Sequence, residues 1–298
     1  MKSKILAIGA FSVVASSFAT IKDARACAIA CQIGDSPSIA SESSVIVWDE
    51  SRRIEHFIRK VDFKAHGSAL GFLVPTPERP EIAEADEAVF GRLESLVPRM
   101  AMKKAGSASF AAISDAIVPV VTVLEQKRVA GMDVAVLEAN NAAALNDWLK
   151  KNGFPSRPAL QEWLDPYVRA GFKIAAFKYA KPDAGGAEIA TKAVRISFTA
   201  LKPFYPYRMP ADTAVDSHQF LRVYVFASKK TRGYLTEGSD KRGWGQIIHI
   251  RGVSDLPNLL EGALPADKLP AGPVWLTIFN DDNVKRTGAA EMYFEKAE

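Results

Sequence analysis

Short blocks of alternating apolar and polar residues recur along the chain, a period typical of β-strands with one buried face. Residues 45–48 are continuously apolar, residues 52–65 alternate, and Glu50 and Ser51 lie between them, which predicts two strands joined by a turn. Residues 120–139 are predicted to form a strand, a turn around Gly131 and a second strand. Further strands are predicted over 172–180, 192–201, 220–228, 246–250, 274–279 and 292–296.

Two segments carry turn or proline signals that refine this pattern. Residues 172–180 and 192–201 flank a Gly-Gly pair and are expected to pair as a hairpin. Residues 71–82 begin as a strand but contain prolines at 75, 77 and 80. Because proline cannot donate to a ladder and biases its predecessor to an extended conformation, this segment is expected to be an edge strand that continues as a rigid connector.

Helical periodicity is concentrated between residues 84 and 169. Residues 84–97 and 142–151 each place apolar residues on one face. Asn140 or Asn141 can cap the second helix, and Gly153 suits the position after its end. A third helix is predicted from apolar residues at helical spacing, with a break or kink because Pro166 lacks the donor that a continuous helix uses. Its apolar face consists of Leu160, Trp163, Leu164, Tyr167 and Val168.

The element count predicts the fold class. Nine to eleven strands with three or four helices confined to the middle third, and few crossovers, indicate an α+β fold with mainly antiparallel sheet. No internal repeat or clean linker divides the chain. We therefore expect residues 27–298 to form one large α+β domain.

The first 26 residues have the pattern of a secretory signal peptide. Lys2 and Lys4 precede an apolar stretch at 5–19, and Ala24-Arg25-Ala26 forms an A-x-A cleavage site. A membrane anchor is the alternative, but the stretch is shorter than the roughly 20 residues a spanning helix needs. Acylation of Cys27 is the other alternative. The sequence predicts cleavage of residues 1–26, export to the periplasm or secretion, and no transmembrane segment afterwards.

Cleavage changes the charge of the protein. The full chain has 38 basic and 34 acidic residues, and the predicted signal removes four basic residues and one acidic residue, leaving 34 and 33. A nucleic-acid partner is not expected, because such a footprint needs a clustered basic face. The one basic cluster, between Lys229 and Arg242, contains Glu237 and Asp240 and is expected to form a solvated hairpin.

Both cysteines, Cys27 and Cys31, lie at the predicted mature N-terminus. In an oxidising compartment such a pair tends to form a disulfide. A helix would hold the two Cβ atoms about 6 Å apart, beyond the roughly 3.8 Å of a disulfide, so a turn or extended loop is expected. A redox pair and half of a metal site are the alternatives. The four histidines that a metal would need are widely scattered: His56, His66, His218 and His249.

Searches for catalytic motifs find few candidates. Elbow, zinc, phosphate-loop and dinucleotide motifs are absent from the sequence. The run Asn280 to Asn283 offers oxygens but not the spacing of a calcium loop. His56 lies beside Glu55 and near Asp49, and in the fold these residues could approach a serine. We expect neither a cofactor nor a metal.

Several segments together resemble one bacterial family. They are the early cysteine pair, "VIVWDESRRIEHFIRKVDFKAHGSALGFLVPTPERPEI", "VTVLEQKRVAGMDVAVLEANNAAALNDWLKKNGF", "LDPYVRAGFKIAAFKY" and the P-x-R of Pro206 to Arg208. In this combination and order the chain resembles the exported family catalogued as domain of unknown function 2330. The resemblance covers about 27–230, implies export, and leaves about 231–298 as a β-rich C-terminal extension. It implies no catalytic residues.

Two functional hypotheses follow. The first is a non-enzymatic envelope protein that binds a partner protein or ligand, with Phe204, Tyr205 and Tyr207 as exposed aromatic contacts. The alternative is a periplasmic hydrolase whose site is assembled from distant residues, with His56 or His249 as the base.

Overall fold

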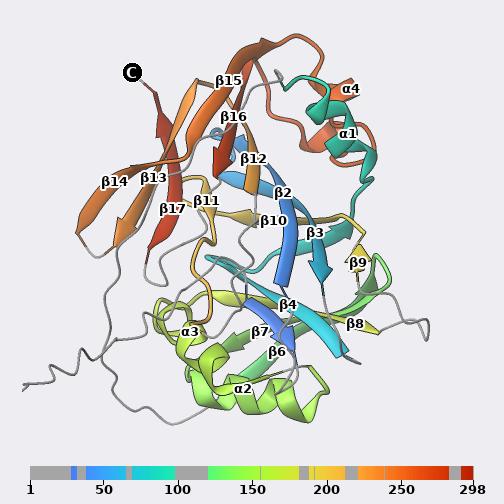
Figure 1. Ribbon diagram of the computed structural model, residues 1–298, viewed down its shortest axis with the longest axis vertical. Helices are drawn as coiled ribbons and strands as arrows, with labels where there is room; N and C mark the ends of the chain where they lie inside the picture. The colour runs from blue at the N-terminus through green and yellow to red at the C-terminus, as the bar shows by residue number, and fades with distance from the viewer. Residues whose placement is uncertain are drawn as a thin grey trace, which may run out of the picture.

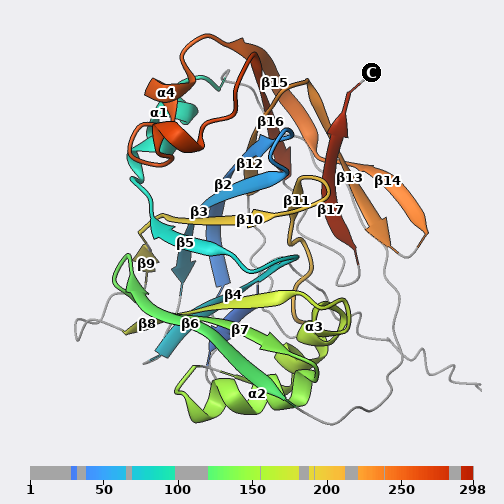
Figure 2. The ribbon, with the colours of Figure 1, turned by 180° about the vertical axis from the view of Figure 1, so that it is seen from behind.

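The computed structural model describes ten stretches of the chain and arranges them in three β-sheets with four α-helices (Figures 1 and 2). The described residues are 28–31, 38–64, 69–97, 120–154, 156–180, 188–190, 192–211, 221–237, 239–281 and 290–297. Seventeen strands fall within these stretches, more than the nine to eleven expected, because short pairing segments such as β1 and β9 have no periodicity to reveal them.

The largest sheet has eight strands and forms the centre of the molecule. In spatial order they are β15 (Gln246–Val253), β16 (Val274–Asp281), β12 (Leu221–Ala227), β2 (Ser38–Asp49), β3 (Ile54–Lys64), β10 (Val194–Thr199) and β5 (Glu81–Glu84), and β9 (Glu188–Ala190) pairs with β3. All pairs are antiparallel except β12 with β2. The predicted pairing of the first two long strands is confirmed, with Val47 opposite His56.

Both faces of this sheet are buried, which explains the continuous apolar run at residues 45–48. Val45 and Val47 of β2 point to one face, where they pack against helices α1 (Ala88–Glu94) and α4 (Leu256–Leu259). Ile46 and Trp48 point to the opposite face and join a second core shared with the other sheets.

A five-stranded antiparallel sheet carries two longer helices (Figure 1). Its order is β1 (Ala28–Cys31), β4 (Ala69–Thr76), β8 (Lys173–Ala180), β7 (Met132–Ala139) and β6 (Val121–Val129), and the helices are α2 (Ala142–Lys151) and α3 (Pro158–Arg169). Asn141 accepts a hydrogen bond from Ala144 N at 3.0 Å, and Gly153 has φ of 71°. The predicted cap and the predicted stop of α2 are therefore confirmed.

The expectation that residues 71–82 form an edge strand is wrong. β4 is paired on both sides, with β1 and with β8. Its proline is tolerated because β1 reaches only from Leu70 to Leu73, so Pro75 lies beyond the end of β1 and faces an unpaired side within the described residues. Residues 81–84 then form the separate strand β5.

The expected hairpin of residues 172–180 with 192–201 is also wrong. β8 lies between β4 and β7 in the five-stranded sheet, whereas β10 lies between β3 and β5 in the eight-stranded sheet. Both strands have their two edges occupied by other partners, so they cannot pair with each other.

The helices are less concentrated than expected. α2 and α3 lie in the middle third of the chain, but α1 precedes it and α4 lies near the C-terminus. The predicted break at Pro166 is absent, since α3 runs continuously through it. Pro166 cannot donate to the carbonyl of residue 162, and Glu162 is exposed, so water can satisfy that carbonyl.

A four-stranded sheet completes the fold, in the order β11 (Phe204–Tyr205), β17 (Glu291–Lys296), β13 (Thr231–Glu237) and β14 (Asp240–Trp244). β13 and β14 form the hairpin expected for the basic cluster. Lys241 and Arg232 lie 2.6 and 2.8 Å from the carboxylate of Glu295. Its basic residues are thus paired with acids along the sheet surface.

Candidate functional site

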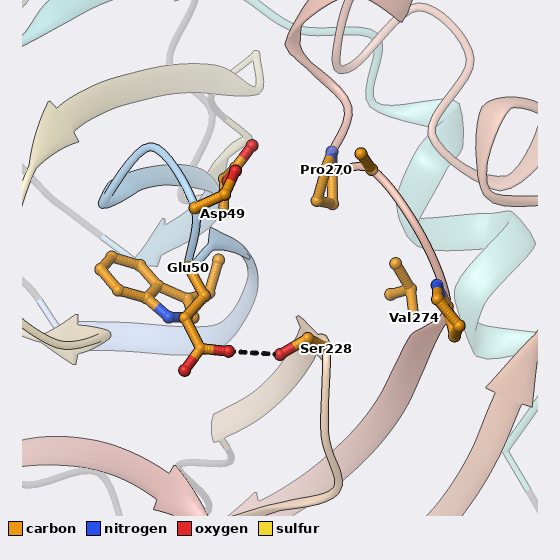
Figure 3. A pocket seen from close by; sticks show the side chains of 9 residues that line it. Asp49, Glu50, Ser228, Pro270 and Val274 are labelled. Atoms are coloured by element: carbon orange, nitrogen blue, oxygen red, sulfur yellow. Dashed lines mark hydrogen bonds between the residues drawn. The ribbon is translucent and has the colours of Figure 1, made fainter.

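A hollow of about 260 Å³ opens between the β2–β3 turn and the segment that leads into β16 (Figure 3). Its lining residues are Trp48, Asp49, Glu50, Ser51, Ser228, Pro270, Ala271, Pro273 and Val274. The hollow combines apolar walls with hydroxyl and carboxylate groups, and the two charged residues that line it, Asp49 and Glu50, are both acidic.

Arg52 connects the two walls of the hollow. Its Nε lies 2.6 Å from Asp49 Oδ2 on the β2–β3 turn. Its terminal nitrogens donate to the carbonyls of Asp267 at 3.1 Å and of Lys268 and Leu269 at 2.9 Å, just before Pro270. One guanidinium therefore sets the distance between elements more than 200 positions apart in the chain.

Both carboxylates of the hollow are held in the ionised form. Burial alone would raise the pKa of Asp49, but hydrogen bonds from Ser51 and Arg52 lower it to about 2. The hydroxyl of Ser228 donates to Glu50 at 2.6 Å (Figure 3) and is the main reason that the pKa of Glu50 is lowered, with Lys229 adding to it. The Glu50 side chain is 55% exposed, so its charge faces solvent at the rim.

His56 and Ser197 form a buried pair on the same side of the eight-stranded sheet. They are opposite residues of β3 and β10, and His56 Nδ1 shares a hydrogen bond with Ser197 Oγ at 2.8 Å. Burial lowers the pKa of His56 to about 4, and the nearby cations Arg195, Lys268 and Arg52 contribute to this lowering.

This pair does not have the properties of an accessible catalytic dyad. His56 is 2% exposed and Ser197 is 7% exposed, and neither lines the hollow. A histidine surrounded by cations is a weak base, because accepting a proton there is disfavoured by burial and by like charge. Within the described residues the pair is part of the packing of β3 against β10.

The other acids near His56 in the sequence do not join it. Glu55 points to the opposite face of β3, where it accepts a hydrogen bond from Phe204 N at 2.8 Å. Adjacent residues of a strand face opposite sides of a sheet, so Glu55 cannot orient His56. Asp49 instead bonds Ser51 and Arg52.

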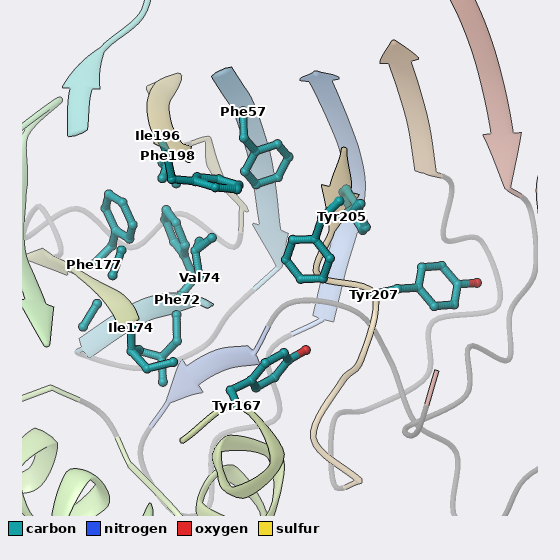
Figure 4. Close-up of a cluster of buried hydrophobic side chains, with 14 of the residues drawn as sticks. Phe57, Phe72, Val74, Tyr167, Ile174, Phe177, Ile196, Phe198, Tyr205 and Tyr207 are labelled. Atoms are coloured by element: carbon teal, nitrogen blue, oxygen red, sulfur yellow. The ribbon is translucent and has the colours of Figure 1, made fainter. Parts of the chain in front are cut away.

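The aromatic residues predicted to be exposed are buried. Phe204, Tyr205 and Tyr207 are each at most 2% exposed, and Figure 4 shows Tyr205 and Tyr207 among core side chains such as Phe57. The ring of Tyr205 packs edge-on against Phe57 at 5.7 Å between centroids. The expectation of an exposed aromatic surface is therefore wrong, and these three residues are not available as surface contacts.

The physical reason lies in the prolines and the buried acids around residues 203–208. Proline lacks an N–H group, so this crossing segment has few donors to satisfy inside the core. Tyr207 N donates to Glu291 at 3.1 Å and Tyr207 Oη donates to Asp281 at 2.7 Å. Arg208 Nε lies 2.6 Å from Glu291, and Trp163 donates to the Arg208 carbonyl at 2.9 Å. The segment thereby joins α3 to two sheets.

The remaining predicted residues give a mixed outcome. Cys27 and the side chain of Cys31 lie outside the described residues, so their disulfide stays a prediction. His66 and His218 lie outside them too, whereas His249 is on β15 opposite Ile278. No metal-binding group of three or more ligands occurs among the described residues. In the same part of the chain, no helix combines the length and apolar character needed to cross a membrane.

Most of the hollow was not predictable from the sequence. Glu50 was recognised only as part of a turn, and Ser228 and Pro270 carried no signal of their own. Their proximity depends on the parallel pairing of β12 with β2 and on the Arg52 contacts. The one sequence feature that pointed to it was the proline pair at 270 and 273 beside a strand.

Comparisons with known proteins give one strong match. No curated protein matches the chain. Among solved structures, the chain is similar to the one described as the crystal structure of baculovirus P35, with 6% sequence identity, a TM-score of 0.34, and coverage of 88% of this chain and 98% of that one. A likeness this weak carries no argument about fold or function. A family model described as an uncharacterized protein conserved in bacteria matches residues 22–242. The chain therefore belongs to that bacterial family, DUF2330.

Proposed function

We propose that this protein is exported to the bacterial envelope and acts there without catalysis, by binding a partner protein at the hollow between the β2–β3 turn and residues 270–274. The observation that carries the proposal is the lining of the hollow. Apolar walls from Trp48, Pro270 and Val274 surround a rim whose charged residues, Asp49 and Glu50, are both ionised acids.

The size of the hollow favours a side chain over a free metabolite. Its volume of about 260 Å³ is below the roughly 300–1,000 Å³ of most small-molecule sites. The aliphatic stem of a lysine or arginine suits apolar walls, while its charged end suits a carboxylate rim. We therefore assign the hollow to a basic side chain presented by a partner.

A hydrolytic function has less support. The His56–Ser197 distance of 2.8 Å is in the range expected for a base and a nucleophile. However, both residues are buried, and the histidine remains neutral until the pH falls to about 4. A binding role requires none of these groups to reach a substrate.

Export rests on residues 1–26, whose basic start, apolar stretch and A-x-A end have the pattern of a cleaved signal. The disulfide proposed between Cys27 and Cys31 would then form in the oxidising compartment and fix the mature N-terminus.

Charge reversal at the rim tests the binding proposal. A photo-crosslinking residue at exposed Ala271, which lines the hollow, is expected to give a discrete cross-linked product in the envelope of the native bacterium. Glu50→Lys is expected to reduce this product about tenfold, because a buried or half-buried like-charge contact costs on the order of 1–2 kcal/mol. The readout is the amount of the cross-linked band.

Two matched controls accompany this experiment. Glu162→Lys changes another exposed acid, on α3, and the same photo-crosslinking residue at Ala170 samples an exposed position at the end of that helix. The proposal fails if Ala170 gives the same product as Ala271, if Glu50→Lys leaves the product unchanged, or if Glu162→Lys removes it equally.

A further inference from the structure

Strand β15 ends the eight-stranded sheet and has one side without a partner. Its only strand neighbour in the described part of the chain is β16. Within that same part, no hydrogen bond from any other element reaches residues 246–253. β14 leads directly into β15 through Gly245, whose φ of 74° turns the chain from one sheet to the other (Figure 1).

The other sheet edges are short or protected. On β6, Arg79 donates to the carbonyl of Leu124 at 3.0 Å, beside a register shift between Val123 and Glu125. β5 has four residues, and β14 has five, including Lys241 and Arg242. Capped carbonyls, bulges, short length and charge are the usual devices that prevent an edge from pairing with another chain.

β15 has few of these devices over most of its length. It has eight residues, contains isoleucine at 247, 248 and 250, and has no proline. β-Branched residues favour strand pairing, and Ile247 is 40% exposed. The register shift between Ile247 and His249 leaves a regular run from His249 to Val253, opposite Ile278 to Val274.

We propose that residues His249–Val253 of β15 accept an extended, acidic segment of a partner protein as an added strand. Main-chain hydrogen bonds would provide the affinity, as in other cases of strand addition. The charge of the edge selects the partner. Residues 240–253 contain the cations Lys241, Arg242 and Arg251 against the single acid Asp240.

Charge also argues against a second copy of this chain as the occupant. Two β15 edges that meet would bring the same cationic residues together, and like charges across a strand pair are destabilising. An acidic segment instead places carboxylates near Arg251, which is exposed on β15. The proposal goes beyond the hollow, because it needs no group that lines it.

A peptide of eight alternating valine and glutamate residues tests the proposal on the mature protein. Amide hydrogen exchange at residues 249–253 is expected to slow when this peptide is added. A peptide of the same sequence with alternate residues N-methylated has the same charge but fewer donors, and is expected to give no protection. Arg251→Glu is expected to weaken binding about fivefold, the upper range of one exposed ion pair.

Two control variants distinguish strand addition at β15 from binding at another edge or at the hollow. Arg128→Glu changes an exposed arginine on the edge strand β6 and is expected to leave binding unchanged, as is Glu50→Lys at the hollow. The proposal is overturned if the N-methylated peptide protects equally, if protection maps to β6, if Arg251→Glu has no effect, or if the same amides become protected by self-association without peptide.

Discussion

Replacing Gly71 with alanine is expected to destabilise the protein by about 3 kcal/mol, at the upper end of the cost of overpacking a core. A Cβ at residue 71 would lie 2.3 Å from the carbonyl oxygen of Phe177. That oxygen belongs to the backbone of β8, which is held between β4 and β7, so it cannot move without breaking a ladder. Chemical denaturation of the wild type and the variant measures the effect.

Gly91→Ala is the matched control for this prediction. Gly91 lies in α1, and a Cβ there would meet no atom within 4 Å. Alanine in a helix is favoured over glycine by about 0.5–1 kcal/mol, so this variant is expected to be slightly more stable. If Gly71→Ala stays within about 0.5 kcal/mol of the wild type, as neutral surface substitutions do, the close approach of β4 and β8 is wrong.

The second prediction concerns the pH dependence of stability, for which Glu291 is responsible. Burial raises the pKa of Glu291 from 4.5 to about 7, and the guanidinium of Arg208 offsets this only in part. Between these values the folded state keeps a proton that the unfolded state releases, so stability falls as pH rises. The total contribution is about 3 kcal/mol, present below pH 4.5 and lost above pH 7.

His56 acts in the opposite direction at lower pH. Its pKa falls from 6.5 to about 4 on folding, so the unfolded state binds the extra proton and stability rises with pH across that range. Above pH 6.5 this contribution is complete, whereas Glu291 is still titrating. Glu55, whose pKa burial also raises, adds to the decline.

The variant Glu291→Gln isolates the effect. In the wild type, the free energy of unfolding is expected to fall by about 1 kcal/mol between pH 6.5 and 8 through Glu291 alone. Glu291→Gln should flatten this decline, and Glu162→Gln, at an exposed position on α3, should not. An unchanged pH slope in Glu291→Gln would mean that Glu291 does not retain a proton in the folded protein.

Local patterns predicted the parts of the fold that depend on neighbouring residues. The β2–β3 and β6–β7 hairpins follow from adjacent alternating blocks. The bounds of α2, its cap at Asn141 and its stop at Gly153 follow from local capping chemistry. These features need no knowledge of distant contacts, which is why periodicity and turn residues were sufficient.

Features that depend on distant pairing were not predicted. β8 and β10 each have sequence patterns of a strand with near neighbours, yet they pair in different sheets. The crossing segment at residues 203–208 looks like an exposed aromatic loop, but buried Glu55 and Glu291 accept its hydrogen bonds. An isolated glutamate in a strand gives no sign that it will bind a backbone more than 80 residues away.

The candidate site divides in the same way. The sequence placed Asp49 near His56 and suggested a serine nearby, and Ser197 is that serine. It did not indicate that the pair would be buried, or that Glu50, Ser228 and Pro270 would enclose a hollow. Chemistry on one strand is visible in the sequence, whereas a surface assembled from three segments is not.

The most direct test of the proposed function is the intact mass of the protein recovered from fractionated cells of the native bacterium. Export predicts a chain that starts at Cys27, found in the envelope or the medium and lighter by two hydrogen atoms than its reduced form, because Cys27 and Cys31 are joined. A full-length chain that keeps Met1, found in the cytosol with both thiols open to alkylation, would contradict the proposal.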